Sequence, residues 1–196
     1  MAPTREQLFR GTRAEKDWGR RLEAFRAYLA VMARLQLDDR LRAKVASSDI
    51  VQQTLLEAFE KRGSFRGTSN GELGAWLRQI LAHNLADAFR AHGRAKRRVD
   101  HERSLEQSLG QSSSNLGGFI AARQTSPSRG AVRAEEALRL AAALSELPEA
   151  QRDVIELHHL KGLSLKEVAD QVRRSPEAVA GLLHRGLKAL KELLEA

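Results

Sequence analysis

The sequence contains no cysteine, few aromatic residues and no long apolar run. None of its 196 residues is cysteine, and only 5% are aromatic. The lack of thiols excludes disulfides, thiolate metal ligands and a cysteine nucleophile, and it suits a reducing compartment. No segment approaches the roughly 18 consecutive apolar residues of a membrane span, and the charged N-terminal segment has no apolar export signal. We therefore expect a cytoplasmic protein without membrane insertion.

The chain carries an excess of positive charge on a composition that can fold. Lysine and arginine number 33 against 25 aspartates and glutamates, which gives a formal net charge of +8, and 42% of the residues are hydrophobic. This apolar fraction is high enough to build folded cores, and the length allows one or two small domains. The basic excess favours a polyanionic partner such as nucleic acid.

Apolar residues in the first half of the chain follow the period of helices. Between Trp18 and Leu35 they recur every three or four positions, which predicts one long helix. A second helix begins near Ser48 and Asp49, a cap residue and a first-turn acid, and ends at Gly63. No stretch alternates polar and apolar residues as a strand would. The first domain is therefore predicted to be all-α.

A third helix is predicted after Ser69, which forms a capping-box pattern with Glu72. Its apolar stripe contains Trp76, which we therefore interpret mainly as a core residue. The opposite face carries Gln79, Ala82, His83, Ala86, Asp87 and Arg90 and continues toward Arg94. The small side chains of Ala82 and Ala86 would let a nucleic-acid backbone approach this face.

The composition changes to serine, glycine and glutamine over 99–134, which is typical of a flexible linker. This segment is expected to join two small helical domains, at 1–98 and 135–196. A short helix within it stays open, as does the choice between a plain tether and a chain threaded through a partner. Its apolar residues are too sparse to predict a core: Leu105, Leu109, Leu116 and Phe119.

The second domain has the pattern of a helix-turn-helix. Gly162 ends one helix, and a capping box at Ser164 and Glu167 begins a short helix over 165–172. After a brief turn, a serine and a proline at 175–176 provide a cap and a first-turn residue for the last helix. Two helices separated by a tight turn match the geometry in which the second helix enters the major groove of DNA.

Basic charge is concentrated in the first domain. Residues 136–196 contain nine lysines and arginines against ten acids, whereas 65–98 contain seven against two. Counterion release supplies most of the non-specific affinity for DNA, so the second domain alone should bind DNA weakly. Another contact must therefore hold it on DNA.

Four segments together resemble the bacterial extracytoplasmic-function (ECF) sigma factors of RNA polymerase. They are SSDIVQQTLLEAFEK, FRG, WLRQILAHNLADAFR and LSELPEAQRDVIELHHLKGLSLKEVADQV. The likeness covers about 18–98 and 135–196. It implies a region 2 helical bundle that binds polymerase and melts the minus-ten element, and a region 4 helix-turn-helix that reads the minus-thirty-five element. The implied partners are core polymerase, through the β′ clamp helices and the β flap, promoter DNA and, in some members, an anti-sigma factor.

The resemblance also implies roles for individual residues. The implied polymerase contacts are Asp49, Gln52, Gln53, Thr54 and Glu57. The implied minus-ten contacts are Phe65 and Arg66, beside a pocket for a flipped base. On the predicted third helix, Gln79, His83 and Asn84 could offer hydrogen bonds to bases, and the basic segment adds Arg90 and Arg94. His83 stands where the family often has asparagine. The implied minus-thirty-five contacts are Arg174, Ser175, Glu177, Ala178, His184, Arg185 and Lys188.

Two other functions are compatible with a small helical protein of this composition. A free-standing helix-turn-helix regulator would bind duplex DNA tightly without polymerase, and the near-neutral second domain argues against it. An enzyme would need a catalytic cluster, and the best candidate is His158 and His159 beside Glu156. These residues lack the H-E-x-x-H spacing of a zinc site, and no phosphate loop or nucleophile elbow is present. We expect no catalytic residue, metal or cofactor.

Overall fold

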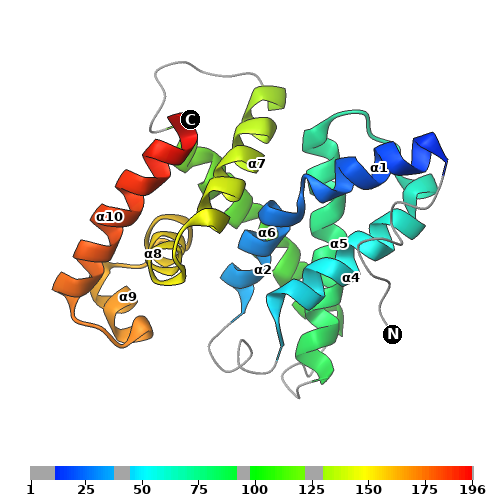
Figure 1. The fold of residues 1–196 in the computed structure, drawn as a ribbon. Coiled ribbons are helices and arrows are strands. Elements are labelled where there is room, and N and C mark those ends of the chain that lie inside the picture. Colours follow the sequence, from blue (N-terminus) through cyan, green and yellow to red (C-terminus); the bar gives the residue numbers. More distant parts are fainter. Residues whose placement is uncertain (1–11, 38–44, 92–97, 122–129, 196) are drawn as a thin grey trace.

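The computed structural model describes residues 12–37, 45–91, 98–121 and 130–195. Within these ranges every regular element is a helix and none is a strand (Figure 1). The prediction of an all-α protein is confirmed. No helix in the described part of the chain is long and apolar enough to cross a membrane.

The predicted first helix is two helices, α1 (Arg13–Glu23) and α2 (Arg26–Gln36). A capping box of Thr12 and Glu15 begins α1. At the break, the amide of Phe25 donates to the carbonyl oxygen of Leu22 at 3.0 Å, a tighter turn than that of an α-helix. The single-helix prediction was wrong because the apolar stripe continues across the break, which contains neither glycine nor proline.

The next elements agree with the sequence pattern. Helix α4 (Ser47–Glu60) is followed by a 3-10 turn, η2 (Arg62–Ser64), and by α5 (Asn70–Ala91). The capping box of α5 is present: the amide of Glu72 donates to Ser69 Oγ at 3.2 Å, and the amide of Ser69 donates to Glu72 Oε2 at 2.9 Å. One row of leucines on α5 is completely buried: Leu73, Leu77, Leu81 and Leu85.

Much of the predicted linker is a long helix, α6 (Arg98–Ala121), packed against α2, α5 and α7 (Figure 1). Leu105, Leu109 and Leu116 are at most 5% exposed. The prediction that these leucines are too sparse for a core was wrong. Together with the buried Ser112 they follow helical spacing, and the serines and glycines between them obscured this pattern.

The C-terminal part begins with α7 (Gly130–Glu146) and α8 (Glu149–Ile155), followed by a π-helical turn, η3 (Glu156–Leu160). The helix-turn-helix then consists of α9 (Leu165–Val172) and α10 (Pro176–Glu195). Gly162, with φ 77°, precedes it, and Arg173, with φ 54°, begins the turn between its helices. The predicted capping box of Ser164 and Glu167 is present.

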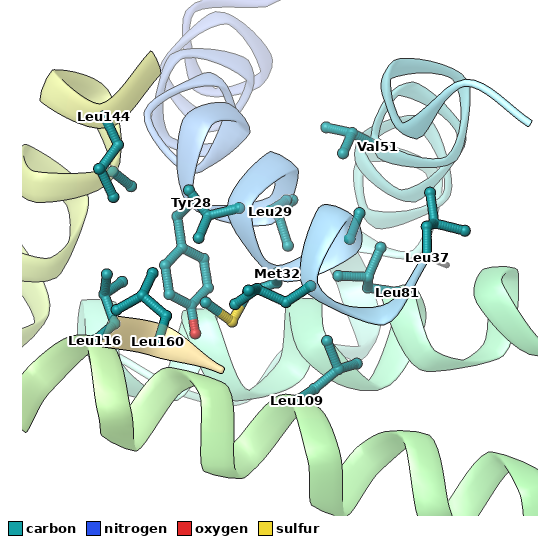
Figure 2. Packing of buried hydrophobic residues seen from close by; sticks show 14 of the residues in the cluster. Tyr28, Leu29, Met32, Leu37, Val51, Leu81, Leu109, Leu116, Leu144 and Leu160 are labelled. Atoms are coloured by element: carbon teal, nitrogen blue, oxygen red, sulfur yellow. The ribbon is translucent and has the colours of Figure 1, made fainter. Parts of the chain in front are cut away.

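A continuous core connects the N-terminal helices with the C-terminal helices. In Figure 2, Tyr28 of α2 lies near Leu116 of α6 and Leu160 of η3, with Leu144 of α7 at the edge of the same cluster. All four side chains are almost completely buried. The helices before residue 92 therefore pack directly on those after residue 130, and α6 contacts both groups (Figure 1).

Candidate nucleic-acid interface

The last helix presents one face to the core and one to solvent. Val179, Leu183 and Leu190 are buried on its inner face. The outer face carries side chains that can bond to bases or phosphates, and all of them are exposed: Glu177, His184, Arg185 and Lys188. Because α10 is the second helix of the helix-turn-helix, this face is the one that such a motif offers to the major groove.

The first turn of α10 is fixed by Ser175. Its hydroxyl oxygen accepts a hydrogen bond from the amide of Ala178 at 3.2 Å, so Ser175 caps the helix as predicted. Hydrogen bonds from its own backbone amide and from Ser175 lower the pKa of Glu177, which therefore carries a negative charge at neutral pH. A carboxylate at this position can accept a hydrogen bond from cytosine N4. Arg174 and Ala178 are exposed beside it.

One glycine of α10 has a packing role. A Cβ at Gly186 would lie 2.9 Å from Ile155 Cδ1 and 3.1 Å from Gln151 Cβ. The glycine therefore lets α10 approach α8 closely, and this contact holds the outer face at a fixed angle to the rest of the domain.

On α5, the exposed strip is narrower than the sequence predicted. Gln79 and His83 are exposed, and Arg90 forms an ion pair with Asp87. The expectation that Ala82 and Ala86 form an open face was wrong, since both are buried. Arg94 lies outside the described residues.

Asn84 is half-buried and connects α5 to α4. Its side-chain amide donates to Thr54 Oγ1 at 3.1 Å and to Glu57 Oε2 at 3.3 Å. Thr54 is itself completely buried, and its hydroxyl donates to the carbonyl oxygen of Ile50 at 2.8 Å. Of the five residues implied to contact polymerase, the structure exposes Asp49, Gln52 and Gln53.

The loop before α5 is held by an aromatic cluster. The ring centroid of Phe65 lies 5.6 Å from that of Trp18 and 5.4 Å from that of Trp76, and the guanidinium carbon of Arg21 lies 5.7 Å from Phe65. Phe65 therefore anchors the loop, while Arg66 remains exposed. Sequence reasoning missed the part of Trp18, because helical spacing alone assigns it to a core face.

His158 and His159 are partly buried, and their contacts are with other residues of the fold. His158 Nδ1 lies 2.7 Å from the carbonyl oxygen of Leu163, and Glu156 is paired with Arg34. Among the described residues there is no group of three or more ligands that could hold a metal ion.

The fold and these surfaces define a class of protein: an all-helical chain that ends in a helix-turn-helix with a polar outer face. The family model "Sigma-70, region 4" matches residues 137–190, which include α9 and most of α10.

Curated relatives extend the similarity to most of the chain. The ECF RNA polymerase sigma factor SigF of Caulobacter vibrioides is 31% identical over 144 residues, covering 74% of this chain and 68% of the relative. SigD of Mycobacterium tuberculosis is 29% identical over 175 residues, covering 89% and 76%. SigX of Bacillus subtilis is 27% identical over 161 residues, covering 79% and 74%. The chain belongs to the ECF sigma factors. It is therefore a sigma factor for promoter-specific transcription.

Proposed function

We propose that this sigma factor reads the minus-thirty-five element with the outer face of α10 and the minus-ten element with α5 and the loop around Arg66. It contributes binding and strand separation to initiation, while polymerase supplies the chemistry. The observation that carries the proposal is the row of exposed polar residues on α10, inside the segment matched by the region 4 family model.

Support for the minus-thirty-five contact comes from the chemistry of that face. Arg185 has the planar guanidinium that bonds in two places to guanine, and Glu177 can accept from cytosine. Lys188 and Arg174 are exposed cations that suit backbone phosphates.

Support for the minus-ten contact comes from the surroundings of the loop. Arg66 is exposed next to a fixed aromatic cluster, and a guanidinium plane can stack on a base removed from the duplex. Gln79 and His83 continue the polar strip along α5. Within the described residues, Asn84 supports this strip by bonding α5 to α4.

Polymerase would be bound by the exposed polar face of α4, formed by Asp49, Gln52 and Gln53. Since the second domain is nearly neutral, two weak DNA contacts held at a fixed spacing by polymerase would reinforce one another. Binding of DNA by the free chain should therefore be weak.

The test is run-off transcription with core RNA polymerase on a pool of promoter fragments, with and without the protein. We expect specific transcripts only when both are present. Replacing Arg185 by alanine should remove a base contact of about 1–3 kcal/mol, a loss on the order of tenfold in transcript yield, and relax the preference at one minus-thirty-five base pair.

Lys16→Ala is the matched control, because it removes one exposed positive charge from α1, far along the chain from α10. It should transcribe as the unmodified protein does. Equal losses in both variants would point to bulk charge and contradict base reading by α10. Tight binding to the same DNA without polymerase would contradict the cooperative mechanism.

A further inference from the structure

The turn of the helix-turn-helix holds an arginine in a left-handed backbone conformation. Arg173, which follows the last residue of α9, has φ 54° and ψ 49°. Its amide and that of Arg174 both donate to the carbonyl oxygen of Ala169, the second at 3.0 Å. These bonds close α9 in the way that usually places a glycine in the left-handed position. The backbone of the turn therefore sets the conformation, whatever side chain stands at 173.

Glycine stands at the other left-handed position that the structure describes. Gly162, with φ 77°, precedes α9, and a Cβ added there would meet no heavy atom within 4 Å. Its glycine therefore answers to the backbone conformation and not to crowding. An L-residue in this conformation brings its Cβ too close to its own carbonyl oxygen, so Arg173 carries a strain that a glycine would relieve. The arginine needs another reason.

Contacts within the chain do not supply that reason. Arg173 is exposed, and its side chain forms no hydrogen bond or ion pair with the residues that the structure describes. A positive charge at the C-terminal end of α9 does interact favourably with the helix dipole. At an exposed site salt screens this interaction, so it offers little compensation for the strain.

The position of Arg173 suits a phosphate group. Every residue from 173 to 178 is exposed, and the turn lies at the outer edge of the C-terminal helices (Figure 1). Ser175 begins α10 directly after it, and Arg185 and Lys188 are exposed further along the same helix. A helix in the major groove lies between two sugar–phosphate strands, and contacts to them fix its register and orientation. A cation on a turn held by two backbone bonds can provide such a contact.

We propose that Arg173 is a positioning residue that contacts a backbone phosphate beside the minus-thirty-five element. The contact fixes where α10 lies along the groove, is independent of base sequence, and is obtained at the expense of fold stability. The phosphate contact rests on the function proposed above. The strain is a property of the free chain and is measured without DNA.

The first experiment compares thermal melts of the free, full-length chain. Arg173→Gly should raise Tm by about 2–4 °C, because glycine adopts the left-handed conformation without strain. Arg173→Asn should raise it by less, since asparagine tolerates this conformation better than arginine but less well than glycine. Gly162→Ala is the matched control and should lower Tm. An unchanged or lower Tm of Arg173→Gly would show that the arginine stabilises α9, and would overturn the proposal.

The second experiment measures binding of the chain with core polymerase to the promoter fragment that gives the most run-off transcript. At about 0.1 M salt, Arg173→Gly and Arg173→Asn should each bind on the order of five- to tenfold more weakly, with a salt slope lower by about 0.9, the value for one phosphate. Asparagine separates the lost charge from the greater flexibility of glycine. Arg173→Lys should keep most of the slope, because lysine also binds phosphate.

Base-pair changes in the minus-thirty-five element distinguish this contact from base reading. They should weaken binding by the same factor in the unmodified chain and in Arg173→Asn, whereas Arg185→Ala should lose one preference. An unchanged slope in Arg173→Asn, or a lysine variant as weak as the asparagine variant, would contradict a phosphate contact.

The outcomes separate this proposal from the one before it. If the unmodified chain yields no specific transcripts, the proposed function fails. Binding of the free chain to a duplex of about 30 base pairs at low salt then decides on Arg173, with the same fall in slope expected. If the unmodified chain transcribes and Arg173→Asn keeps its affinity and slope, the phosphate contact is wrong and the proposed function stands.

Discussion

Helices α5 and α6 lie side by side and have similar lengths, 22 and 24 residues, but different sequences produce them. Helix α5 begins at a capping box and buries a continuous row of leucines. Helix α6 has only three buried leucines along its described side chains, separated by serine and glycine. The helical state of α5 is thus encoded locally, whereas that of α6 depends on the surfaces against which it packs.

The largest expected effect compares one buried leucine from each helix. Both Leu81 of α5 and Leu109 of α6 are completely buried. Leu81→Ala should lower the free energy of unfolding by about 2–5 kcal/mol, as cavity-forming substitutions do. Leu109→Ala should lower it by less, because the loss cannot exceed the free energy with which α6, a helix rich in serine and glycine, packs on its neighbours. Urea unfolding followed by circular dichroism measures both.

Equal losses, with the same dependence on urea concentration, would contradict the comparison. They would show that α6 unfolds only together with α5 in one cooperative transition.

The same difference explains how much of the fold the sequence could predict. The bounds of α9 and the capping boxes at Ser69 and Ser164 were readable because they depend on residues three or four apart. Helix α6 was not readable, because serines and glycines obscure the helical spacing of its leucines and because the helices that bury them lie elsewhere in the sequence. The Arg34–Glu156 pair joins residues 122 apart, and no local pattern reports such a contact.

The candidate site shows the same limit. The outer face of α10 follows from helical spacing, and the structure exposes all of its predicted polar residues. Thr54 and Asn84 were expected at surfaces but face one another between α4 and α5. Periodicity places a residue on a helix face, but it does not say which neighbouring helix covers that face.

A smaller effect is expected when a glycine of each helix is replaced by alanine. Gly117→Ala in α6 should raise the free energy of unfolding by about 0.4–1 kcal/mol, because the new methyl group enters open space and the unfolded chain loses freedom. Gly74→Ala in α5 should not show this gain, since its Cβ would lie 3.2 Å from Cε1 of the buried Phe25 ring. Thermal melts of the two variants test this pair. A stabilised Gly74→Ala together with an unchanged Gly117→Ala would reverse the comparison.

The smallest effect concerns the charged cap that begins α5. Hydrogen bonds from the amides of Ser69 and Thr68 lower the pKa of Glu72 to about 2. A carboxyl group whose pKa is lower in the folded state stabilises that state above its ordinary pKa, here 4.5, and loses this contribution as the pH falls toward 2. Glu72→Gln should therefore be less stable than the unmodified chain near neutral pH, with a difference that shrinks as the pH falls through this window.

Urea midpoints over a pH series measure this difference in stability. Leu109→Ala is the control, since removing apolar atoms gives a loss that does not follow the titration of a carboxyl group. A Glu72→Gln difference that stays constant with pH would show that α5 does not depend on a charged cap, and would weaken the contrast between a locally encoded helix and a docked one.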